Sequence, residues 1–425
     1  MSKPVIGFVG MTHLGINSAA AAAGQGAETV CFDTDATVIA QLKSGKLSIV
    51  EPGLPELLEQ NNSRITYTAE AGDLKRCGVV YISADVPTDD QGQSDFSGIL
   101  ALIDTVAAGL GRDAILVILC QVPPGFTRSL SLPKERLYYQ VETLIFGRAV
   151  ERAMSPERFI VGCAEPQQPL PPVFAHFLES FGCPILPMRY ESAELAKISI
   201  NMCLVASVSV ANTLAELCEN IGADWSEVVP ALKLDKRIGQ YAYLAPGLGI
   251  AGGNLERDLA TVLALSEQYG TDGGIVSAWV ANSRYRKDWT WRTLNRLVLA
   301  QDPGARIAVL GLAYKEDTHS TKNSPSLSLL SYLQNYPVVV YDPVVSSSDA
   351  GILFKSASNA MEAVQDVDVV CIMTPWEEFK QLSSSDLAKR MRGRWLIDPY
   401  RVIDGKAARA AGLRHITLGI VPEKV

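Results

Sequence analysis

The sequence has no paired cysteines and few histidines, and we expect none of its apolar stretches to cross a bilayer. Its eight cysteines are scattered without a CxxC pair and its four histidines are dispersed, so we expect no metal site. Scattered cysteines are typical of reduced thiols in a cytoplasmic protein. The N-terminus shows no secretory signal pattern, and apolar stretches such as Ala114–Cys120 are far too short to span a membrane.

The sequence also has fewer basic than acidic residues. The 425 residues include 38 Lys and Arg against 46 Asp and Glu, which gives a net charge of −8. Nucleic-acid and anionic membrane surfaces need clustered positive charge, so neither partner is expected. The composition, with 48% hydrophobic and 20% charged residues, is ordinary for a globular protein, and the length predicts two or three domains.

The chain opens on an alternation of strand and helix patterns. Val5–Val9 is apolar and β-prone, Leu14–Ala23 is typical of an Ala-rich helix, and Glu28–Phe32 predicts a second strand that ends on an acid. This order, with glycines between the first strand and the helix, is that of a dinucleotide-binding βαβ unit. Further strands are predicted at Val79–Ala84 and Ala114–Cys120, which favours a parallel sheet covered by helices.

The first glycine cluster matches the dinucleotide fingerprint at its first and third positions. Threonine takes the middle position, where glycine normally lets the backbone approach the pyrophosphate. An acid at the end of the second strand accepts from a ribose 2′-hydroxyl and repels a 2′-phosphate, so the pattern favours NAD over NADP. An αβ unit that has lost its cofactor is the alternative. The predicted cofactor-binding residues are Gly10, Thr12, His13, Leu14, Gly15 and Asp33.

A second start of the same kind comes late in the chain. Arg306–Leu310 predicts a strand, Ser326–Leu333 a helix, and Val338–Tyr341 a strand that ends on Asp342. Gly10 and Asp33 lie 23 residues apart in the first unit, whereas Gly311 and Asp342 lie 31 apart in the second. The two units therefore repeat a type of fold and not a sequence. Two more strands are predicted at Val369–Met373 and Trp395–Ile397.

Between the two units lies a helical stretch. Glu191 to Ile221 contains no Pro and no Gly and has apolar residues at helical spacing, which predicts one helix of about 45 Å. A helix that long usually bridges domains or forms a dimer face; two helices with a bend are the alternative. We therefore expect three domains, at residues 1–189, 190–300 and 301–425.

A second glycine-rich stretch runs from Tyr243 to Asp258. Its four glycines would let a loop wrap closely around a ligand. A mobile linker is the alternative, and it is disfavoured because the glycines alternate with apolar residues.

The chain carries further short motifs along its length: Glu51-Pro-Gly-Leu54, Ala193-Glu-Leu-Ala-Lys197 with Asn201, Asp235-Lys-Arg-Ile-Gly239, Gly311-Leu-Ala-Tyr-Lys315, Ser324-Pro325, Tyr341-Asp-Pro343 and Thr374-Pro-Trp376. Together with the glycine loop, these motifs resemble the UDP-glucose/GDP-mannose dehydrogenase family over nearly the full length. The resemblance implies an α/β protein with two Rossmann-like doubly wound domains joined by a long central helix and a helical middle domain. It also implies NAD at the N-terminal domain, a UDP-sugar as substrate, a homodimer, and a cytoplasmic place in polysaccharide biosynthesis.

The chain departs from the family at residues that the resemblance makes catalytic. Family members usually oxidise a CH₂OH group to a carboxylate in two hydride transfers, and the second transfer needs a cysteine thiolate in the glycine loop. That position is Asn254 here, whose amide is not a useful nucleophile. The family threonine is Gln121, and of two family glutamates the first remains as Glu142 while the second is Phe146. In the family these groups hold and activate the water of hydrolysis.

The remaining residues suit one hydride transfer. Lys197 and Asn201 are four apart on one helix face and could stabilise a developing oxyanion. Asp258 could order a water or hold Lys197, and Asn254 could bind a sugar hydroxyl. The family's paired acids are His319 and Ser320 here, and its arginine is Lys322. By resemblance Arg237 reaches the neighbouring subunit's sugar site, and the predicted substrate-binding residues are Thr143, Leu144, Arg237, Tyr243, Gly247, Gly249, Lys315 and Lys322.

The sequence thus predicts an NAD-dependent oxidoreductase for a nucleotide sugar that stops after a single hydride transfer. An epimerase that recycles NAD and a non-catalytic binder of NAD or a nucleotide sugar remain open. A weaker alternative is a dehydrogenase of the 6-phosphogluconate or hydroxyacid type, against which the second terminal αβ domain argues.

Overall fold

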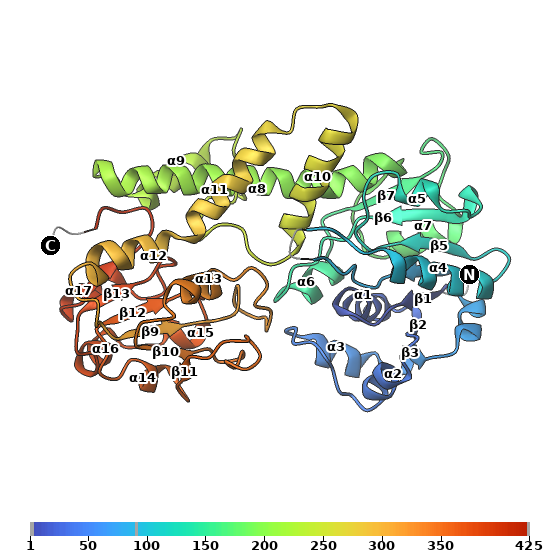
Figure 1. Ribbon diagram of the computed structural model, residues 1–425. Helices are drawn as coiled ribbons and strands as arrows, with labels where there is room; N and C mark the ends of the chain where they lie inside the picture. Colours follow the sequence, from blue (N-terminus) through green and yellow to red (C-terminus); the bar gives the residue numbers. More distant parts are fainter. Residues whose placement is uncertain (1–3, 90–91, 423–425) are drawn as a thin grey trace. The chain divides into compact units, whose positions relative to one another are not determined.

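A computed structural model describes residues 4–89 and 92–422 (Figure 1). These residues form two compact units. The first ends at Ile200 and the second begins at Asn201, with Gly92 grouped in the second.

The first unit is built on an eight-stranded sheet, counted over the described residues. β1 lies inside it, and its last residue, Val9, stands opposite Phe32 of β2 and Ile82 of β4. All neighbouring pairs are parallel except β6 and β7. The strands, in spatial order, are β3 (Ile65–Thr68), β2 (Glu28–Phe32), β1 (Val5–Val9), β4 (Val79–Ile82), β5 (Ile115–Ile118), β6 (Leu137–Gln140), β7 (Phe159–Cys163) and β8 (Ile185–Arg189).

Helices cover both faces of this sheet, because alternate strand residues point to opposite sides and both sides are apolar. Tyr81 lies in one hydrophobic cluster with residues of α1, α3 and α7, whereas Val80 lies in another with residues of α4 and α8. The helices of the unit that precede α8 are α1 (His13–Gly24), α2 (Ala36–Lys43), α3 (Leu54–Gln60), α4 (Ser97–Gly109), α5 (Phe126–Ser129), α6 (Ala149–Met154) and α7 (Pro172–Glu179).

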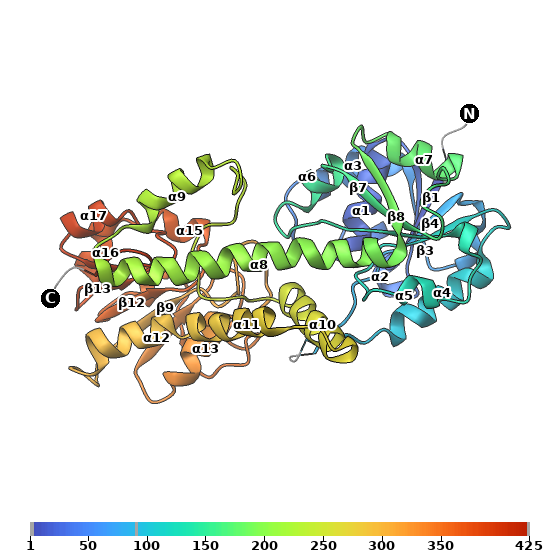
Figure 2. The same cartoon turned by 90° about the horizontal axis from the view of Figure 1, so that it is seen from above.

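Helix α8 (Tyr190–Ile221) runs unbroken for 32 residues from the first unit into the second (Figure 2). The prediction of one long helix is confirmed, and the alternative of two helices with a bend is wrong. The helix stays intact because it contains neither Pro nor Gly. It is long and apolar enough to cross a membrane, yet it also carries ionisable side chains with partners inside the protein, such as Glu194.

The second unit holds a six-stranded, wholly parallel sheet in its described residues. Its strands, in spatial order, are β11 (Lys355–Ser356), β10 (Val338–Tyr341), β9 (Ile307–Leu310), β12 (Val369–Ile372), β13 (Trp395–Ile397) and β14 (Arg414–Ile416). Around this sheet and α8 lie α9 (Trp225–Leu234), α10 (Asn254–Tyr269), α11 (Gly274–Lys287), α12 (Trp289–Leu294), α13 (Pro325–Tyr332), α14 (Ala360–Ala363), α15 (Glu377–Lys380), α16 (Ser384–Arg390) and α17 (Gly405–Ala410).

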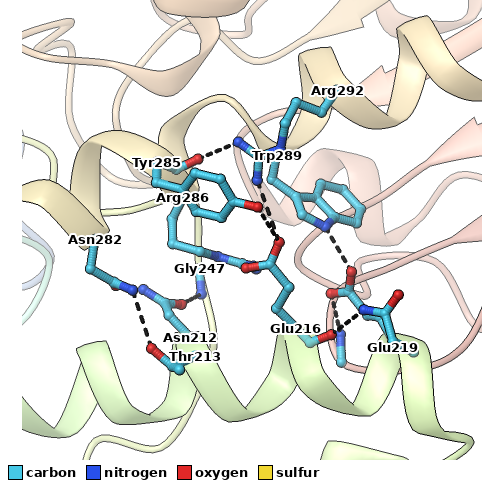
Figure 3. Close-up of polar contacts among 12 residues, drawn as sticks. Asn212, Thr213, Glu216, Glu219, Gly247, Asn282, Tyr285, Arg286, Trp289 and Arg292 are labelled. Carbon is cyan, nitrogen blue, oxygen red and sulfur yellow. Dashed lines mark hydrogen bonds and ion pairs between the residues drawn. The ribbon is translucent and has the colours of Figure 1, made fainter.

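A polar cluster joins α8 to α11 and α12 within the second unit (Figure 3). The carboxylate of Glu216 accepts from the hydroxyl of Tyr285 at 3.0 Å and pairs with the fully buried guanidinium of Arg286 at 2.9 Å. Glu219 accepts from the indole nitrogen of Trp289 and the amide of Gly419, each at 3.0 Å, and burial raises the pKa of Glu219. The end of α8 is thereby fixed to the chain that leaves the C-terminal sheet.

The predicted element ends agree closely with the structure. Four predicted strands match residue for residue, and the others are one to three residues shorter than predicted. The predicted α/β class with two Rossmann-like sheets and a long central helix is confirmed. The three-domain division stays a prediction beside the two compact units.

Candidate functional site

The first glycine turn is shaped by close backbone contacts. Gly10 has φ +91°, and a Cβ placed on it would lie 2.5 Å from the Cβ of Ala84. A Cβ on Gly15 would lie 1.9 Å from the carbonyl oxygen of Gly10. Both predicted cofactor-binding glycines therefore sit where a larger residue does not fit.

Thr12 precedes α1 but its side chain does not cap the helix. Its hydroxyl accepts from the amide of Asp85 at 3.1 Å and donates to the carbonyl of Ser83 at 3.3 Å, which ties the turn to the end of β4. The first-turn amides of α1, from His13 to Gly15, are thus not capped by this threonine, and such amides are natural ligands for a phosphate.

Asp33 lies at the end of β2, as predicted. One carboxylate oxygen accepts from the amide of Met11 at 2.8 Å and the other from the amide of Asp35 at 2.9 Å. A carboxylate has about four acceptor sites, so lone pairs remain for the hydroxyls of a ribose. The glycine turn and this acid fit NAD.

The matching acid of the C-terminal sheet is used differently. Asp342 also ends its strand, but its carboxylate accepts five hydrogen bonds from the protein, and the helix after β9 starts only at Pro325. An acid so occupied does not serve a ribose, which leaves the N-terminal sheet as the place for the cofactor. The donors are the amides of Leu312, Ala313, Val344 and Val345 and the indole of Trp376.

Residues 142–144 and Lys197 come together in the first unit. The ammonium of Lys197 lies 3.0 Å from a carboxylate oxygen of Glu142, with side chains only 11% and 15% exposed. The other oxygen of Glu142 accepts from the amide of Leu144 at 2.7 Å, and the guanidinium of Arg152 donates to the carbonyl of Thr143 at 2.7 Å. Glu142, predicted as a retained family glutamate, and Lys197, the predicted oxyanion donor, are therefore partners.

The turn after β5 is held by Glu194, a residue that the sequence analysis names only as part of a family motif. Glu194, fully buried on α8, accepts from the amides of Gly125 at 2.6 Å and Thr127 at 2.8 Å, and burial raises its pKa. Gln121 is buried at the start of the same turn. Glu194 thus ties the backbone that follows Gln121 to α8, the helix that also carries Lys197.

The glycine loop of the second unit is anchored along its length. The amide of Gly247 donates to the side chain of Asn212 at 2.7 Å, that of Ile250 to the hydroxyl of Ser283 at 2.7 Å, and that of Gly252 to the carbonyl of Lys322 at 3.0 Å. The mobile-linker alternative is wrong, because both α8 and α11 hold the loop in place.

We expect Gly249→Ala to destabilise the protein by about 3 kcal/mol and Gly247→Ala to leave stability nearly unchanged. Gly249 has φ +79°, and its added Cβ would lie 2.4 Å from the carbonyl oxygen of Ser283, whereas a Cβ on Gly247 meets open space. Thermal unfolding of the two variants checks this. Equal midpoints would contradict the anchored loop.

Three of the predicted catalytic residues belong to the second unit, Asn201 on α8 and Asn254 and Asp258 on the first turns of α10. The side-chain amide of Asn201 donates to the carboxylate of Asp258 at 2.5 Å, and both are buried. Asn254 is the first residue of α10 and is exposed. Asp258 thus binds Asn201, while Lys197 has Glu142 as its partner.

The predicted nucleotide-binding residues differ in their surroundings. Lys322 lies beside the glycine loop, where a Cβ on Gly253 would be 3.7 Å from its ammonium. The ammonium of Lys315 lies 6.0 Å from the ring of Tyr314. The side chain of Arg237 is 89% exposed and pairs with Asp235, whose carboxylate raises the pKa of this arginine. Tyr243 is half exposed.

Comparison with known proteins supports one family across the chain. Three models of the UDP-glucose/GDP-mannose dehydrogenase family match: the NAD binding domain at residues 5–176, the central domain at 191–284 and the UDP binding domain at 308–405. A UDP-glucose 6-dehydrogenase of Pseudomonas aeruginosa is 30% identical over 97% of this chain and 96% of its own. The chain belongs to this family.

Other relatives of the UDP-glucose/GDP-mannose dehydrogenase family agree. A UDP-glucose 6-dehydrogenase of Rickettsia typhi is 28% identical over 97% of this chain and 99% of its own. In fold the chain is similar to a UDP-glucose dehydrogenase from Pyrobaculum islandicum, with a TM-score of 0.85 and 24% identity over 99% of this chain and 98% of that one. It is also similar to a UDP-D-ManNAc dehydrogenase from Pyrococcus horikoshii, with a TM-score of 0.84 and 24% identity over 98% and 99%.

As a member of the UDP-glucose/GDP-mannose dehydrogenase family, the protein is an NAD-dependent oxidoreductase of nucleotide sugars. The predictions of family, cofactor and substrate class are confirmed. The family assignment decides against the 6-phosphogluconate or hydroxyacid type. The roles of individual residues remain predictions.

Proposed function

We propose that this enzyme removes a single hydride from a carbinol carbon of a UDP-sugar and does not carry it on to a carboxylate. The observation that carries the proposal is Asn254 at the first position of α10. A cysteine there would be favoured as thiolate by the amides and dipole of the helix start. The side-chain amide of Asn254 is not converted into a nucleophile by the helix start, and it forms no covalent adduct with an aldehyde.

The residues kept by the chain are those that one oxidation needs. Bound NAD supplies the hydride acceptor. Glu142, with Lys197 beside it at 3.0 Å, takes the hydroxyl proton, and the ammonium stabilises the oxygen as it becomes anionic. In the second unit, Asn201, oriented by Asp258, and Asn254 keep side-chain amides, which donate to and accept from hydroxyl groups.

The residues lost by the chain are those that hydrolysis needs. This chain has Gln121 where the family has a threonine, and Phe146 where the family has its second glutamate. The ring of Phe146 stacks on that of His13 with centroids 4.0 Å apart, so this position serves packing and does not activate water.

Product stoichiometry tests the proposal. Purified protein and NAD⁺ are incubated with UDP-, GDP- and CDP-sugars while NADH absorbance and product mass are followed together. One NADH per sugar with an aldehyde or ketone supports it. Two NADH with an acid overturn it. No net NADH with an isomerised sugar would point to an epimerase, and no NADH with an unchanged sugar would point to a binder, each of which also overturns it.

We further propose that two copies of the cytoplasmic enzyme pair along α8. Its exposed apolar side chains follow a heptad spacing, which is the pattern of a helix seam, and they are 39–63% exposed. Only a third of the most apolar part of α8 is buried within one chain. The seam consists of Val210, Leu214, Leu217 and Ile221.

Leu217→Arg is expected to weaken this dimer about a hundredfold, because a guanidinium in an apolar seam lacks a partner. Light scattering after size-exclusion chromatography at micromolar concentration should show half the mass of the wild type. Leu353→Arg, at a fully exposed leucine outside the seam, is the matched control and should stay dimeric. A Leu217→Arg variant that remains dimeric would refute the seam.

A further inference from the structure

Glu51 is a buried carboxylate that joins two separate segments of the first unit. Its side chain has no solvent exposure. One oxygen accepts from the amide of Ala149 at 2.6 Å, and the other accepts from the amide of Gly147 at 3.1 Å. The second oxygen also lies 3.0 Å from Nε2 of His13. A single charge thus holds the end of the 141–149 segment and the first residue of α1.

His13 stands between these partners. It is the first residue of α1, its side chain is 9% exposed, and its ring is stacked on Phe146 at an interplanar angle of 30°. His13 therefore contacts the 141–149 segment twice, through the ring of Phe146 and through the carboxylate of Glu51. Neither the cofactor turn nor the 141–149 segment can shift without disturbing one of these contacts.

The packing around this bridge is tight. Glu51 precedes α3, and Leu54, the first residue of that helix, is fully buried. At the opposite end of α1 from His13, a Cβ on Gly24 would lie 2.8 Å from the sulfur of Met154, so α1 and α6 are in close contact there. A bridge set among close-packed elements transmits a displacement instead of absorbing it.

We propose that Glu51 and His13 are positioning residues that couple the cofactor turn to the substrate segment. The inference rests on the proposed function, with NAD at the predicted turn of Gly10 to Gly15 and the sugar at the predicted residues Glu142, Thr143 and Leu144. A cofactor that orders the start of α1 fixes the ring of His13, and His13 holds Glu51. Glu51 then fixes the amides of Gly147 and Ala149, which end the segment that carries Glu142.

The coupling is reciprocal by linkage, so an ordered substrate segment also favours the bound cofactor. We expect NAD to slow amide exchange in residues 141–149 about fivefold, the low end of ordinary coupling between sites. The effect needs no nucleotide sugar, because the bridge lies within one unit.

Hydrogen exchange with and without saturating NAD⁺ tests the proposal on the full-length protein. In the wild type, peptides over residues 10–16 and over 141–149 should both gain protection. In His13→Phe, which keeps a ring against Phe146 but removes the nitrogen that faces Glu51, the first peptide should gain protection and the second less than twofold. His13→Gln, whose amide still donates to Glu51, should recover part of the effect. His176→Phe, at an exposed histidine on α7, is the matched control and should behave as wild type.

The outcomes separate the inference from the function on which it rests. NAD that protects neither peptide would remove the cofactor from the turn and the proposed function with it. NAD that protects the turn alone in the wild type would overturn the coupling and leave the function standing. Protection of both peptides that persists in His13→Phe and in Glu51→Gln would show direct contact of NAD with the segment and would also overturn the coupling. If Glu51→Gln fails to fold, His13→Phe decides alone.

Discussion

Asn254→Cys is expected to acquire a reactive thiol and still to make no appreciable acid. The new thiol would sit at the first residue of α10, a helix of 16 residues, with the ammonium of Lys322 beside the preceding glycine. A helix start and a nearby cation lower a thiol pKa, so the thiolate forms readily at neutral pH. It would add to an aldehyde, and the thiohemiacetal would lose a hydride to a second NAD⁺ and a proton to solvent to become a thioester. Hydrolysis then fails, because Gln121 and Phe146 do not activate water.

Two measurements check this outcome. Iodoacetamide should label the Asn254→Cys variant at least tenfold faster than the wild-type protein, whose own cysteines serve as the reference. Mass spectrometry of the protein after reaction with NAD⁺ and sugar should show a covalent adduct that turns over slowly. Efficient release of acid with two NADH per sugar by this single variant would refute the assignment of Gln121 and Phe146. If the assignment holds, adding Gln121→Thr and Phe146→Glu to Asn254→Cys should speed the release of acid from the covalent adduct.

The ends of the fold's elements were predictable where local chemistry decides them. Val5–Val9 and Glu28–Phe32 were found because apolar, β-prone runs stop at a glycine and at an acid, and the structure has the same bounds. The helix over Glu191 to Ile221 was predictable because no residue interrupts it. Such signals lie within a few residues of the element they define.

Other strands escaped prediction because tertiary contacts define them. β8 is largely exposed and contains Pro187, so its sequence has no clear strand pattern, and its register with β7 makes it a strand. β11 has two residues and depends on pairing with β10. Neither strand carries a periodic signal long enough to be detected from sequence alone.

The site shows the same division. The positions of Gly10, Gly15 and Asp33 were predictable from spacing, because steric limits and strand ends belong to the local chain, whereas their role in cofactor binding stays a prediction. The contacts of Glu51 were not predictable, since its partners lie 38 to 98 residues away along the chain. Residues that act through distant backbone amides leave no local pattern.

Lys197→Met is expected to lower kcat about a thousandfold, as is Glu142→Gln, and the double variant should be little worse than either single one. The two side chains are 3.0 Å apart and nearly buried, so each needs the other: the carboxylate as base is held by the ammonium, and the ammonium is placed by the carboxylate. Groups that act as a unit are not additive. Steady-state kinetics of the wild type, the two single variants and the double variant give a double-mutant cycle, from which the coupling between the two side chains follows. Lys389→Met, at an exposed lysine that pairs with Asp386, is the control and should keep wild-type activity. A double variant slowed by the product of the single effects, about a millionfold, would mean that the two groups act in separate steps.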